Sequence, residues 1–494
     1  MSYIGRQLNL PASTVQLTAD GAITAGKPVV IKSDGSATIP QEQGIGTEVT
    51  FDGTDVADDI NIVYDTGNDK VLITYRDGSN SSYGTAVVGT VSGDSISFGT
   101  PVVFESANTI RMSTAYDANA GKVLIVYRDA GNSNYGTAIV ATISGTSVSF
   151  GSAAVFKSAA IDGTDVVYSP DDNFSVIIFG IGSGSYDAYY CSATISGTSV
   201  SFGTEGTAHG GSFTNVRAGQ SVYDTTNDRI VFAYRDIGES NQGYATVGQI
   251  NNANSITWGS DVQWSTSGGP DYDIGLCFDS NAGKVVIVYS NQGNNDYGTA
   301  VVGTVSGTSI SFGTPVVFYS GVNEHTFPAF DSSTNKVGIL YKDDANTSVP
   351  DPLDCIIGTV SGTTMTFSTS FNVGPRQTGQ ARRSLVFDPD TNQFVAAYQD
   401  YTGGAQTGKA RVFNSVTPKN TLSSESFIGF AENGCADNEL LTVQLGGSVN
   451  DKQTGLTAGQ TYFVRDDATI STTAGDPSVT AGTAVSSTEI LVKG

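Results

Sequence analysis

Residues 60–104 read INIVYDTGNDKVLITYRDGSNSSYGTAVVGTVSGDSISFGTPVVF, and this stretch decides the fold. Turn residues divide it into four short apolar runs, which we expect to be strands at about 60–64, 70–75, 84–91 and 95–104. The connections TGND, RDGSNSSY and SGD are short enough to join antiparallel neighbours in sequence order. The stretch therefore predicts an up-and-down sheet of four strands.

The same pattern returns six more times at a period of about fifty residues. In each unit an aromatic-Asp pair is followed, ten residues after the Asp, by an aromatic that ends an apolar strand; the third unit has Ser in place of Asp. The pairs are Asp65 with Tyr75, Asp117 with Tyr127, Ser169 with Phe179, Asp224 with Tyr234, Asp279 with Tyr289, Asp331 with Tyr341, and Asp388 with Tyr398. A closed ring hides the two end sheets that a linear solenoid would expose, so we predict an all-β, seven-bladed β-propeller.

The seventh unit contains only three of the four strands, because the phrase SFGTPVVF fails to appear after GKARVFNSV. A similar phrase, GIGTEVTF, stands at 44–51, before the first aromatic-Asp pair. We predict that this N-terminal segment is the closing strand of blade seven.

The two ends of the chain share a phrase of their own. TAGKPVVIKSDG begins at residue 24, TAGQTYFVRDDA at 457 and TAGTAVSSTEILVKG at 480. We predict that residues 1–43 and 417–494 form the two halves of one small discontinuous β domain, with the propeller, 44–416, inserted between them.

Composition excludes several classes of partner. The chain has 24 basic and 48 acidic side chains, a net charge of −24, which opposes binding to nucleic acid and to anionic lipid surfaces. We find no apolar run long enough to span a membrane and no secretory leader, so membrane insertion is not expected. The four cysteines are far apart and lack CxxC spacing, which favours folding in a reducing cytosol over a zinc site or a disulfide scaffold.

Catalytic signatures are weak. The two histidines, His209 and His325, have no second His or Cys at ligand spacing, and we interpret them as surface or packing residues. Glycoside hydrolysis needs only two carboxylates, yet the sialidase-type Asp-box pattern S-x-D-x-G-x-T-W is missing. We therefore expect no enzymatic activity, no catalytic residue and no cofactor.

The repeated Asp of the aromatic-Asp pair falls at a turn, where a short carboxylate accepts backbone N–H bonds. The alternative role is calcium binding, for which DPDTN, with Asp388, Asp390 and Asn392, is the best case. This segment lacks the central Gly and the Glu at the twelfth position of an EF-hand loop. The turn interpretation is preferred, and no metal site is predicted.

The longer turns between the second and third strands are the candidate receptor-binding surface, because all seven emerge on one face of the ring. Planar rings beside Asn, Asp and Arg suit contact with a sugar, whereas solvated turn charges are the alternative. The candidate residues are Arg76, Asp77, Tyr83, Arg128, Asp129, Tyr135, Arg235, Asp236, Tyr244 and Tyr297. Related loop positions are Tyr186, Asn291, Lys342, Asp343, Asp400 and Tyr401.

The terminal segments YIGRQLNLPAS, FIGFAENG and LTVQLGGSVNDKQTGLTAGQTYFVRDDATIST resemble the ends of bacteriophage virion proteins, notably tail-fibre and other appendage proteins of marine phages. The resemblance implies a non-enzymatic virion component that is assembled in the host bacterial cytoplasm and contacts other virion proteins. It also implies a homo-oligomer, a trimer in many fibres, with a host-surface glycan or protein as a further partner.

Two alternatives stay open. The first is a capsid or tail decoration protein that stabilises the particle. The second is a propeller lectin or glycan-active enzyme that shares only its end domains with phages.

Overall fold

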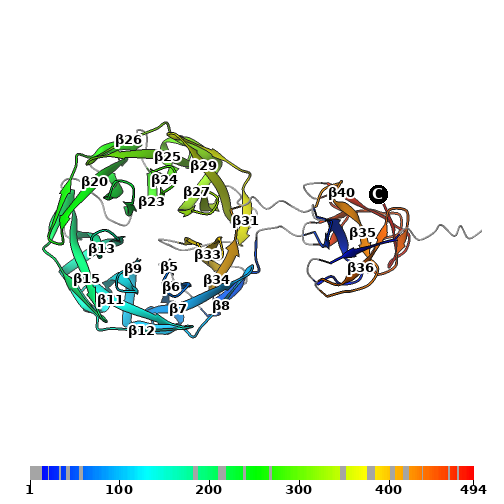
Figure 1. Ribbon diagram of the computed structural model, residues 1–494, viewed down its shortest axis with the longest axis horizontal. Coiled ribbons are helices and arrows are strands. Elements are labelled where there is room, and N and C mark those ends of the chain that lie inside the picture. Colours follow the sequence, from blue (N-terminus) through cyan, green and yellow to red (C-terminus); the bar gives the residue numbers. More distant parts are fainter. Residues whose placement is uncertain are drawn as a thin grey trace, which may run out of the picture. The chain divides into compact units, whose positions relative to one another are not determined.

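The computed structural model describes residues 14–19, 22–32, 35–40, 45–54, 59–181, 187–209, 219–236, 241–265, 270–344, 352–374, 384–400, 406–415, 422–436, 438–465, 468–474 and 478–493. The chain forms two compact units, residues 45–417 and residues 1–44 together with 418–494. The first unit is a seven-bladed β-propeller (Figure 1), as the repeat predicts. Among the described residues, we find no helix with the length and hydropathy of a membrane span.

The first three blades follow one another along the chain. Blade one contains β5 (Asn61–Asp65), β6 (Lys70–Asp77), η1 (Gly78–Asn80), β7 (Tyr83–Ser92), β8 (Ser95–Phe98) and the first half of β9 (Val102–Asp117). Blade two contains the rest of β9, β10 (Lys122–Asp129), η2 (Ala130–Asn132), β11 (Tyr135–Ser144), β12 (Ser147–Phe150) and the first half of β13 (Ala154–Ser169). Blade three contains the rest of β13, β14 (Phe174–Ile181), β15 (Ala188–Ser196), β16 (Ser199–Phe202) and β17 (Gly206–His209).

The last four blades keep this order. Blade four contains β18 (Gln220–Asp224), β19 (Arg229–Asp236), β20 (Gln242–Asn252), β21 (Ser255–Trp258) and β22 (Val262–Ser265). Blade five contains β23 (Pro270–Asp279), β24 (Lys284–Asn291), η4 (Gln292–Asn294), β25 (Tyr297–Ser306), β26 (Ser309–Phe312) and the first half of β27 (Val316–Asp331). Blade six contains the rest of β27, β28 (Lys336–Asp343), β29 (Leu353–Ser361), β30 (Thr364–Phe367) and β31 (Phe371–Gly374). Blade seven contains β32 (Leu385–Asp388), β33 (Gln393–Asp400), β34 (Thr407–Phe413) and β4 (Val49–Asp52).

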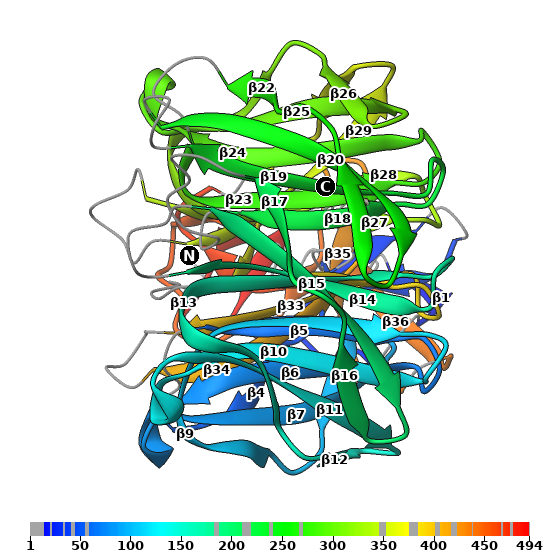
Figure 2. The same ribbon diagram turned by 90° about the vertical axis from the view of Figure 1, so that its left-hand side faces the viewer.

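Three long strands belong to two blades each. The first half of β9 pairs with β7 at the rim of blade one, and its second half pairs with β10 as the innermost strand of blade two. β13 and β27 make the same crossing, and β9 and β13 are visible in the side view (Figure 2). The sequence analysis expected a single strand over 95–104, whereas the structure interrupts it after Phe98 and carries β9 on to Asp117.

The fourth strand of blade seven comes from the start of the chain. β4 pairs antiparallel with β34, with Asp52 opposite Gly408 and Val49 opposite Ala410. The ring of Phe51 lies 5.3 Å from that of Tyr75 in blade one. β4 shares residues 49–51 with the stretch 44–51 that the sequence marked as the closing strand.

The core of the propeller consists of layers between neighbouring blades. The repeated aromatic lies two residues before the end of the second strand of each blade, forms the centre of a layer and is at most 1% exposed. These residues are Tyr75, Tyr127, Phe179, Tyr234, Tyr289, Tyr341 and Tyr398. At five interfaces an aromatic of the preceding outer strand packs on this centre: Phe51 on Tyr75, Phe104 on Tyr127, Phe156 on Phe179, Trp264 on Tyr289 and Phe318 on Tyr341. Burial of these rings explains why the aromatic repeats.

The second unit is built from both ends of the chain, as predicted. One sheet has the order β1 (Thr14–Thr18), β36 (Leu440–Leu445), β35 (Phe427–Ala431), β2 (Pro28–Ile31) and β3 (Ala37–Thr38). The other has the order β37 (Val449–Asn450), β41 (Ile490–Val492), β40 (Val479–Ala484), β38 (Thr461–Val464) and β39 (Ile470–Ser471). The N-terminal strands β1 and β2 pair with the C-terminal strands β36 and β35, so neither half is a complete domain alone.

Candidate functional site

The carboxylates of the candidate loops hold the loops themselves in shape. Asp77 begins η1 and accepts a hydrogen bond from the backbone N–H of Asn80, and Asp129 does the same for Asn132 at the start of η2. Asn291 begins η4 and accepts from the N–H of Gly293. These side chains therefore perform the N-cap function that Asp and Asn perform at helix starts.

The arginines of the loops also have local partners. The Nε of Arg128 donates to Asn134 Oδ1 at 3.0 Å, and the Nε of Arg235 donates to Asn241 Oδ1 at 3.2 Å. Arg76 occupies the corresponding position of β6. The Asn partners have φ near +60°, a backbone conformation that Asn tolerates better than most residues. Arg128 and Arg235 thus each hold the residue that turns the chain back toward the third strand.

The loop tyrosines are half-buried, but they are not all equivalent. Tyr83, Tyr135 and Tyr297 each begin a third strand, where Tyr83 pairs with Asp77 and Tyr135 with Asp129. Tyr244 differs, because the residue opposite Asp236 is Gln242. Tyr244 instead lies opposite the central Tyr234, at the position that Thr85 occupies in blade one. The sequence analysis grouped Tyr244 with the other three, and the register of β20 corrects this.

The structure thus gathers the predicted residues in sets, one set per blade. Tyr186 and Tyr401 lie outside the described residues. Lys342 of the sixth blade forms ion pairs with Glu324 at 3.0 Å and Asp344 at 3.1 Å.

The sequence analysis missed a position that varies from blade to blade while its surroundings repeat. The position lies on the outer strand of each blade. It comes two residues after the outer-strand residue that pairs with the third strand opposite the central aromatic, and it lies directly beside the central aromatic of the next blade. The seven residues there are Asp52, Glu105, Lys157, His209, Ser265, Tyr319 and Gly374. The signal was available, because aligning the seven units on their glycines places these unlike residues in one column.

Contacts at two of these positions illustrate the variety. The hydroxyl of Tyr127 donates to Glu105 Oε2 at 2.9 Å. The Nζ of Lys157 lies 5.9 Å from the ring centre of Phe179 and 5.5 Å from that of Tyr189, and pairs with Glu205 at 2.7 Å. The same position therefore places an acidic side chain in one interface between blades and a cation over aromatic rings in another.

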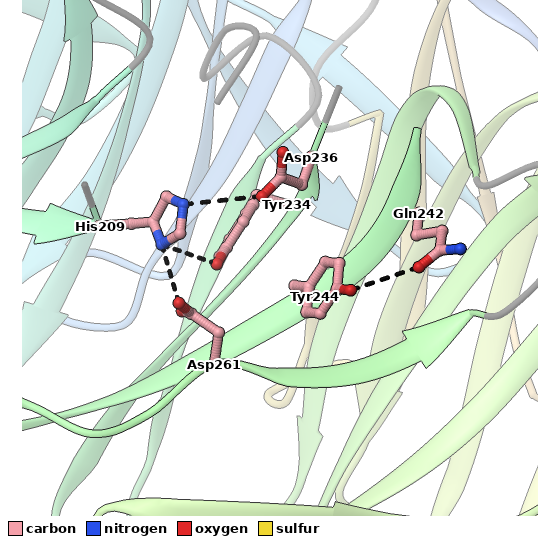
Figure 3. A network of polar contacts seen from close by, with 6 residues as sticks. All are labelled: His209, Tyr234, Asp236, Gln242, Tyr244 and Asp261. Carbon is pink, nitrogen blue, oxygen red and sulfur yellow. Dashed lines mark hydrogen bonds and ion pairs between the residues drawn. The ribbon is translucent and has the colours of Figure 1, made fainter. Parts of the chain in front are cut away.

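His209 occupies this position between blades three and four (Figure 3). Its Nδ1 lies 3.0 Å from Asp261 Oδ2 and 2.9 Å from the hydroxyl of Tyr234, and its Nε2 lies 3.8 Å from Asp236 Oδ2. The outer-strand aromatic is replaced here by Ala208, and the His209 ring packs on Tyr234 with ring centres 4.6 Å apart. Only 9% of the His209 side chain is exposed, so it is a packing residue inside a polar network.

Electrostatics of this network favour a charged Asp261. Burial raises the pKa of Asp261, but hydrogen bonds from His209 and Tyr234 outweigh burial and hold the pKa below its ordinary value. Burial, with the Asp261 contact, raises the pKa of Tyr234 far above its usual range. The tyrosine is therefore a neutral hydroxyl and, being fully buried, is inaccessible to a substrate.

A cavity of about 460 Å³ lies against the innermost strands of the propeller, and its wall is mainly apolar. The lining includes the turn aromatics Tyr64, Phe278, Phe330 and Phe387 with Pro389. Blades one to four have Tyr at the turn, and Tyr64 donates to Asp390 of blade seven at 2.6 Å. Blades five to seven have Phe, which lacks this hydroxyl, and all three of these Phe residues line the cavity.

The repeated turn Asp has the structural role that the sequence predicted. In blades one, two, four, five, six and seven its carboxylate accepts backbone N–H bonds from residues two or three positions later, and Ser169 accepts one in blade three. In the DPDTN segment Asp388 accepts from the N–H groups of Asp390 and Thr391. Within the described ranges, no group of three or more His, Cys, Asp or Glu side chains is arranged to hold a metal.

Comparison with known proteins supports the fold. No protein-family model and no curated protein sequence matches the chain. The BP39L lectin from Burkholderia pseudomallei is similar in structure, with a TM-score of 0.53 and 10% identity over 73% of this chain and 97% of the lectin chain. A protein of unknown function from Dyadobacter fermentans gives a TM-score of 0.43 at 13% identity, covering 80% and 99% of the two chains. The NanB sialidase of Streptococcus pneumoniae gives 0.43 at 10% identity, covering 74% and 70%. The first likeness shows a shared fold; it does not transfer an activity.

Proposed function

We propose that this chain is a non-enzymatic structural protein of a bacteriophage virion that presents its propeller to glycans on the host surface. The observation that carries the proposal is the contrast between a repeated frame and one varied position in each blade. The central aromatics, turn residues and glycines repeat, whereas the position beside each central aromatic holds seven different residues, of which some, such as Glu105, are half-buried and others, such as Ser265, are buried. A rigid scaffold that varies one position from blade to blade suits recognition, because it fixes side chains that differ from site to site.

The virion role rests on the terminal segments, whose phrases resemble those of phage tail-fibre and appendage proteins. The unit that combines both termini is then the part that contacts other virion proteins. By the same resemblance the protein is a homo-oligomer of the assembled particle, with a trimer as the expected form. The first eleven residues of that resemblance lie outside the described residues.

The proposal of binding without cleavage is supported by the occupation of the carboxylates. Glycoside hydrolysis generally needs two carboxyl groups placed on either side of the scissile bond. Asp77 and Asp129 accept bonds within their own loops, and Asp236 and Asp261 contact His209. The likeness to a protein named as a lectin agrees with this proposal at the level of fold.

Competition for adsorption tests the proposal. Purified protein added to host cells should reduce adsorption of phage particles in which mass spectrometry detects this chain. A chain present in particles whose adsorption it fails to reduce would favour the decoration role instead. Absence of the chain from particles would overturn the virion assignment, and release of reducing sugar from host polysaccharide would overturn the non-enzymatic one.

A further inference from the structure

Blade four departs from the near-identical blades one, two and five at adjacent positions of its outer half. On the third strand, opposite the central Tyr, those blades carry Thr85, Thr137 and Thr299. Each Thr pairs with a Val of the outer strand, namely Val103, Val155 and Val317. In blade four the corresponding pair is Tyr244 and Gln263. Two small residues are thus replaced by a ring and a carboxamide on neighbouring strands.

The ring of Tyr244 is fixed from below. It stacks on Tyr234 with ring centres 6.4 Å apart and an angle of 25° between the planes. Tyr234 is itself fully buried and packs against His209 in the same interface, between blades three and four (Figure 3). A half-buried ring that rests on a buried ring loses little further freedom when a ligand covers it, which favours binding.

Two carboxamides lie beside this ring. Gln242 Oε1 accepts from the Tyr244 hydroxyl at 3.3 Å and from Gln263 Nε2, which also donates to the carbonyl of Ser265 at 3.2 Å. Among the described residues, Gln242 Nε2 therefore donates to no protein acceptor, and Gln263 Oε1 accepts from no protein donor. The arrangement leaves one fixed donor group and one fixed acceptor at the edge of an aromatic platform.

From these contacts we infer that Tyr244, Gln242 and Gln263 form a binding site for a neutral saccharide. The C–H face of a pyranose is attracted to the electron-rich face of a tyrosine ring. Neighbouring sugar hydroxyls both donate and accept, which matches the paired carboxamides. The inference rests on the proposed glycan-binding function and assigns it a place and a ligand class.

Charge excludes acidic sugars from this site. Asp236 lies opposite Gln242, and both Asp236 and Asp261 contact His209 in the same interface. The Asp261 carboxyl is held in its charged form by His209 and Tyr234. The chain as a whole carries a net charge of −24. A sugar that carries a carboxylate would be repelled by the nearby Asp carboxylates and by the net negative charge of the whole chain, whereas a neutral sugar would not.

Blade three supplies an internal control. Tyr189 stacks on Phe179 as Tyr244 stacks on Tyr234, with ring centres 6.0 Å apart at an angle of 25°. Its outer-strand partner is Thr207 rather than Gln, and Lys157 Nζ lies 5.5 Å from the centre of its ring. The Tyr189 ring therefore already has a cationic partner and lacks the paired carboxamides.

The test uses substitutions that the repeat itself makes at the same positions. Full-length wild type, Tyr244→Thr, Gln263→Val and Tyr189→Thr are compared on an array of neutral and sialylated oligosaccharides, with titration calorimetry on the saccharides that bind. Wild type should bind neutral saccharides, and Tyr244→Thr and Gln263→Val should each weaken binding by roughly tenfold or more. Tyr189→Thr should leave the affinity unchanged, and unchanged thermal unfolding confirms that each variant is folded.

A gain of function provides the second readout. Tyr297→Gln, Thr299→Tyr and Val317→Gln together place the same three side chains in blade five and should raise the stoichiometry from one to two saccharides per chain. Wild-type binding that Tyr244→Thr leaves intact overturns this site while the proposed function stands. Preference for sialylated saccharides overturns the ligand class. A wild-type protein that binds no saccharide overturns both the site and the glycan-binding function, and blocked adsorption would then point to a protein receptor.

Discussion

At the scale of single residues, the glycine that follows the aromatic at the end of β8, β12, β21 or β26 is fixed by the backbone of the next blade. A Cβ on Gly99, Gly151, Gly259 or Gly313 would lie 1.8–1.9 Å from a carbonyl oxygen in the next blade's hairpin turn. Gly46 meets Asp94 of blade one in the same way, which extends the pattern across the closure. Ser368 stands at this place in blade six, and the next blade has no such hairpin because its fourth strand is β4. The exception therefore confirms the cause.

Replacing Gly151 by Ala should destabilise the propeller. The added methyl would overlap the carbonyl oxygen of Thr198, and a backbone atom in a packed interface yields only by moving two blades apart. We expect a loss of about 1–3 kcal/mol or more in the free energy of unfolding, measured by urea denaturation. Ser368→Ala is the matched control and should cost clearly less. Equal losses for the two variants would show that contact with the neighbouring turn is not the cause.

Asp354 should make stability depend on pH. Burial raises the pKa of Asp354 to about 6, the charge of Asp343 adds to the shift, and a hydrogen bond from Asn372 opposes it. The folded protein holds the proton of Asp354 more tightly than the unfolded chain does. The stabilisation of the folded state by the protonated carboxyl is therefore fully present below about pH 4 and is lost as pH rises through 6. Asp354→Asn should therefore be more stable than wild type at pH 7, by about 1–2 kcal/mol after allowance for partial exposure.

Unfolding of wild type and Asp354→Asn by urea at pH 4, 5, 6 and 7 checks this expectation. The stability difference between the two proteins should grow with pH over this range. A difference that is constant from pH 4 to 7 would mean that Asp354 titrates normally in the folded protein.

At the scale of elements, the turn between the first and second strands of each blade depends on one short side chain. Asp224 Oδ1 accepts from the N–H groups of Thr226 and Asn227, at 2.9 and 3.0 Å, and Oδ2 accepts from the Asn227 side chain at 2.8 Å. In blade three the hydroxyl of Ser169 accepts from the N–H of Asp172 at 3.3 Å. A carboxylate is thus preferred at this turn, but an oxygen acceptor of any kind completes it.

Substitutions at Asp224 test this hierarchy. Asp224→Ala removes the charged acceptor of the Thr226 and Asn227 N–H groups and should cost about 1–3 kcal/mol. Asp224→Ser restores one acceptor, as Ser169 does, and should recover part of that loss. Thermal unfolding orders wild type, Ser and Ala from most to least stable. Indistinguishable Ser and Ala variants would argue that the carboxylate acts through its charge alone.

Much of the element level was predictable from sequence because turn chemistry and burial act locally. The ten-residue interval from Asp to the central aromatic follows from one hairpin, and the structure keeps it in every blade. The register of Tyr244 was missed although the loop lengths agree: Gln242 follows Asp236 by the same interval as Tyr83 follows Asp77, and matching tyrosine to tyrosine hid that Gln242 is the residue opposite Asp236. The varied position beside the central aromatic was missed for another reason: its neighbours come from the next blade, and a single unit does not show them.

At the scale of the molecule, the ring depends on a strand that is not joined through a hairpin to its neighbour. Phe51 of β4 is 6% exposed and packs on Tyr75 and Phe98, with ring centres 5.3 and 5.7 Å apart. Phe156 makes the same contacts on Phe179 and Phe202 between blades two and three. The two phenylalanines occupy equivalent interfaces, but only Phe51 lies at the closure.

Truncation of either ring should reduce overall stability, by about 3–5 kcal/mol for a well-packed Phe. Only Phe51→Ala should also release the closing strand, because β4 has no covalent hairpin to hold it against β34. Hydrogen exchange followed by mass spectrometry should find faster exchange over 45–52 in Phe51→Ala than in Phe156→Ala. Equal protection of this segment in both variants would contradict the special weakness of the closure.

The pairing of β4 with β34 also sets a schedule for biosynthesis. Asp52 cannot pair until Gly408, about 360 residues later in the chain, has been synthesised. At roughly 5–20 residues per second, the ribosome needs on the order of 20–70 s to deliver the partner. During that interval six sheets accumulate with an open edge at each end of the row, and β1 and β2 wait longer still for β36 and β35. The strands made first are thus the last to pair, and translation speed becomes a determinant of how long the nascent chain exposes its edges to aggregation.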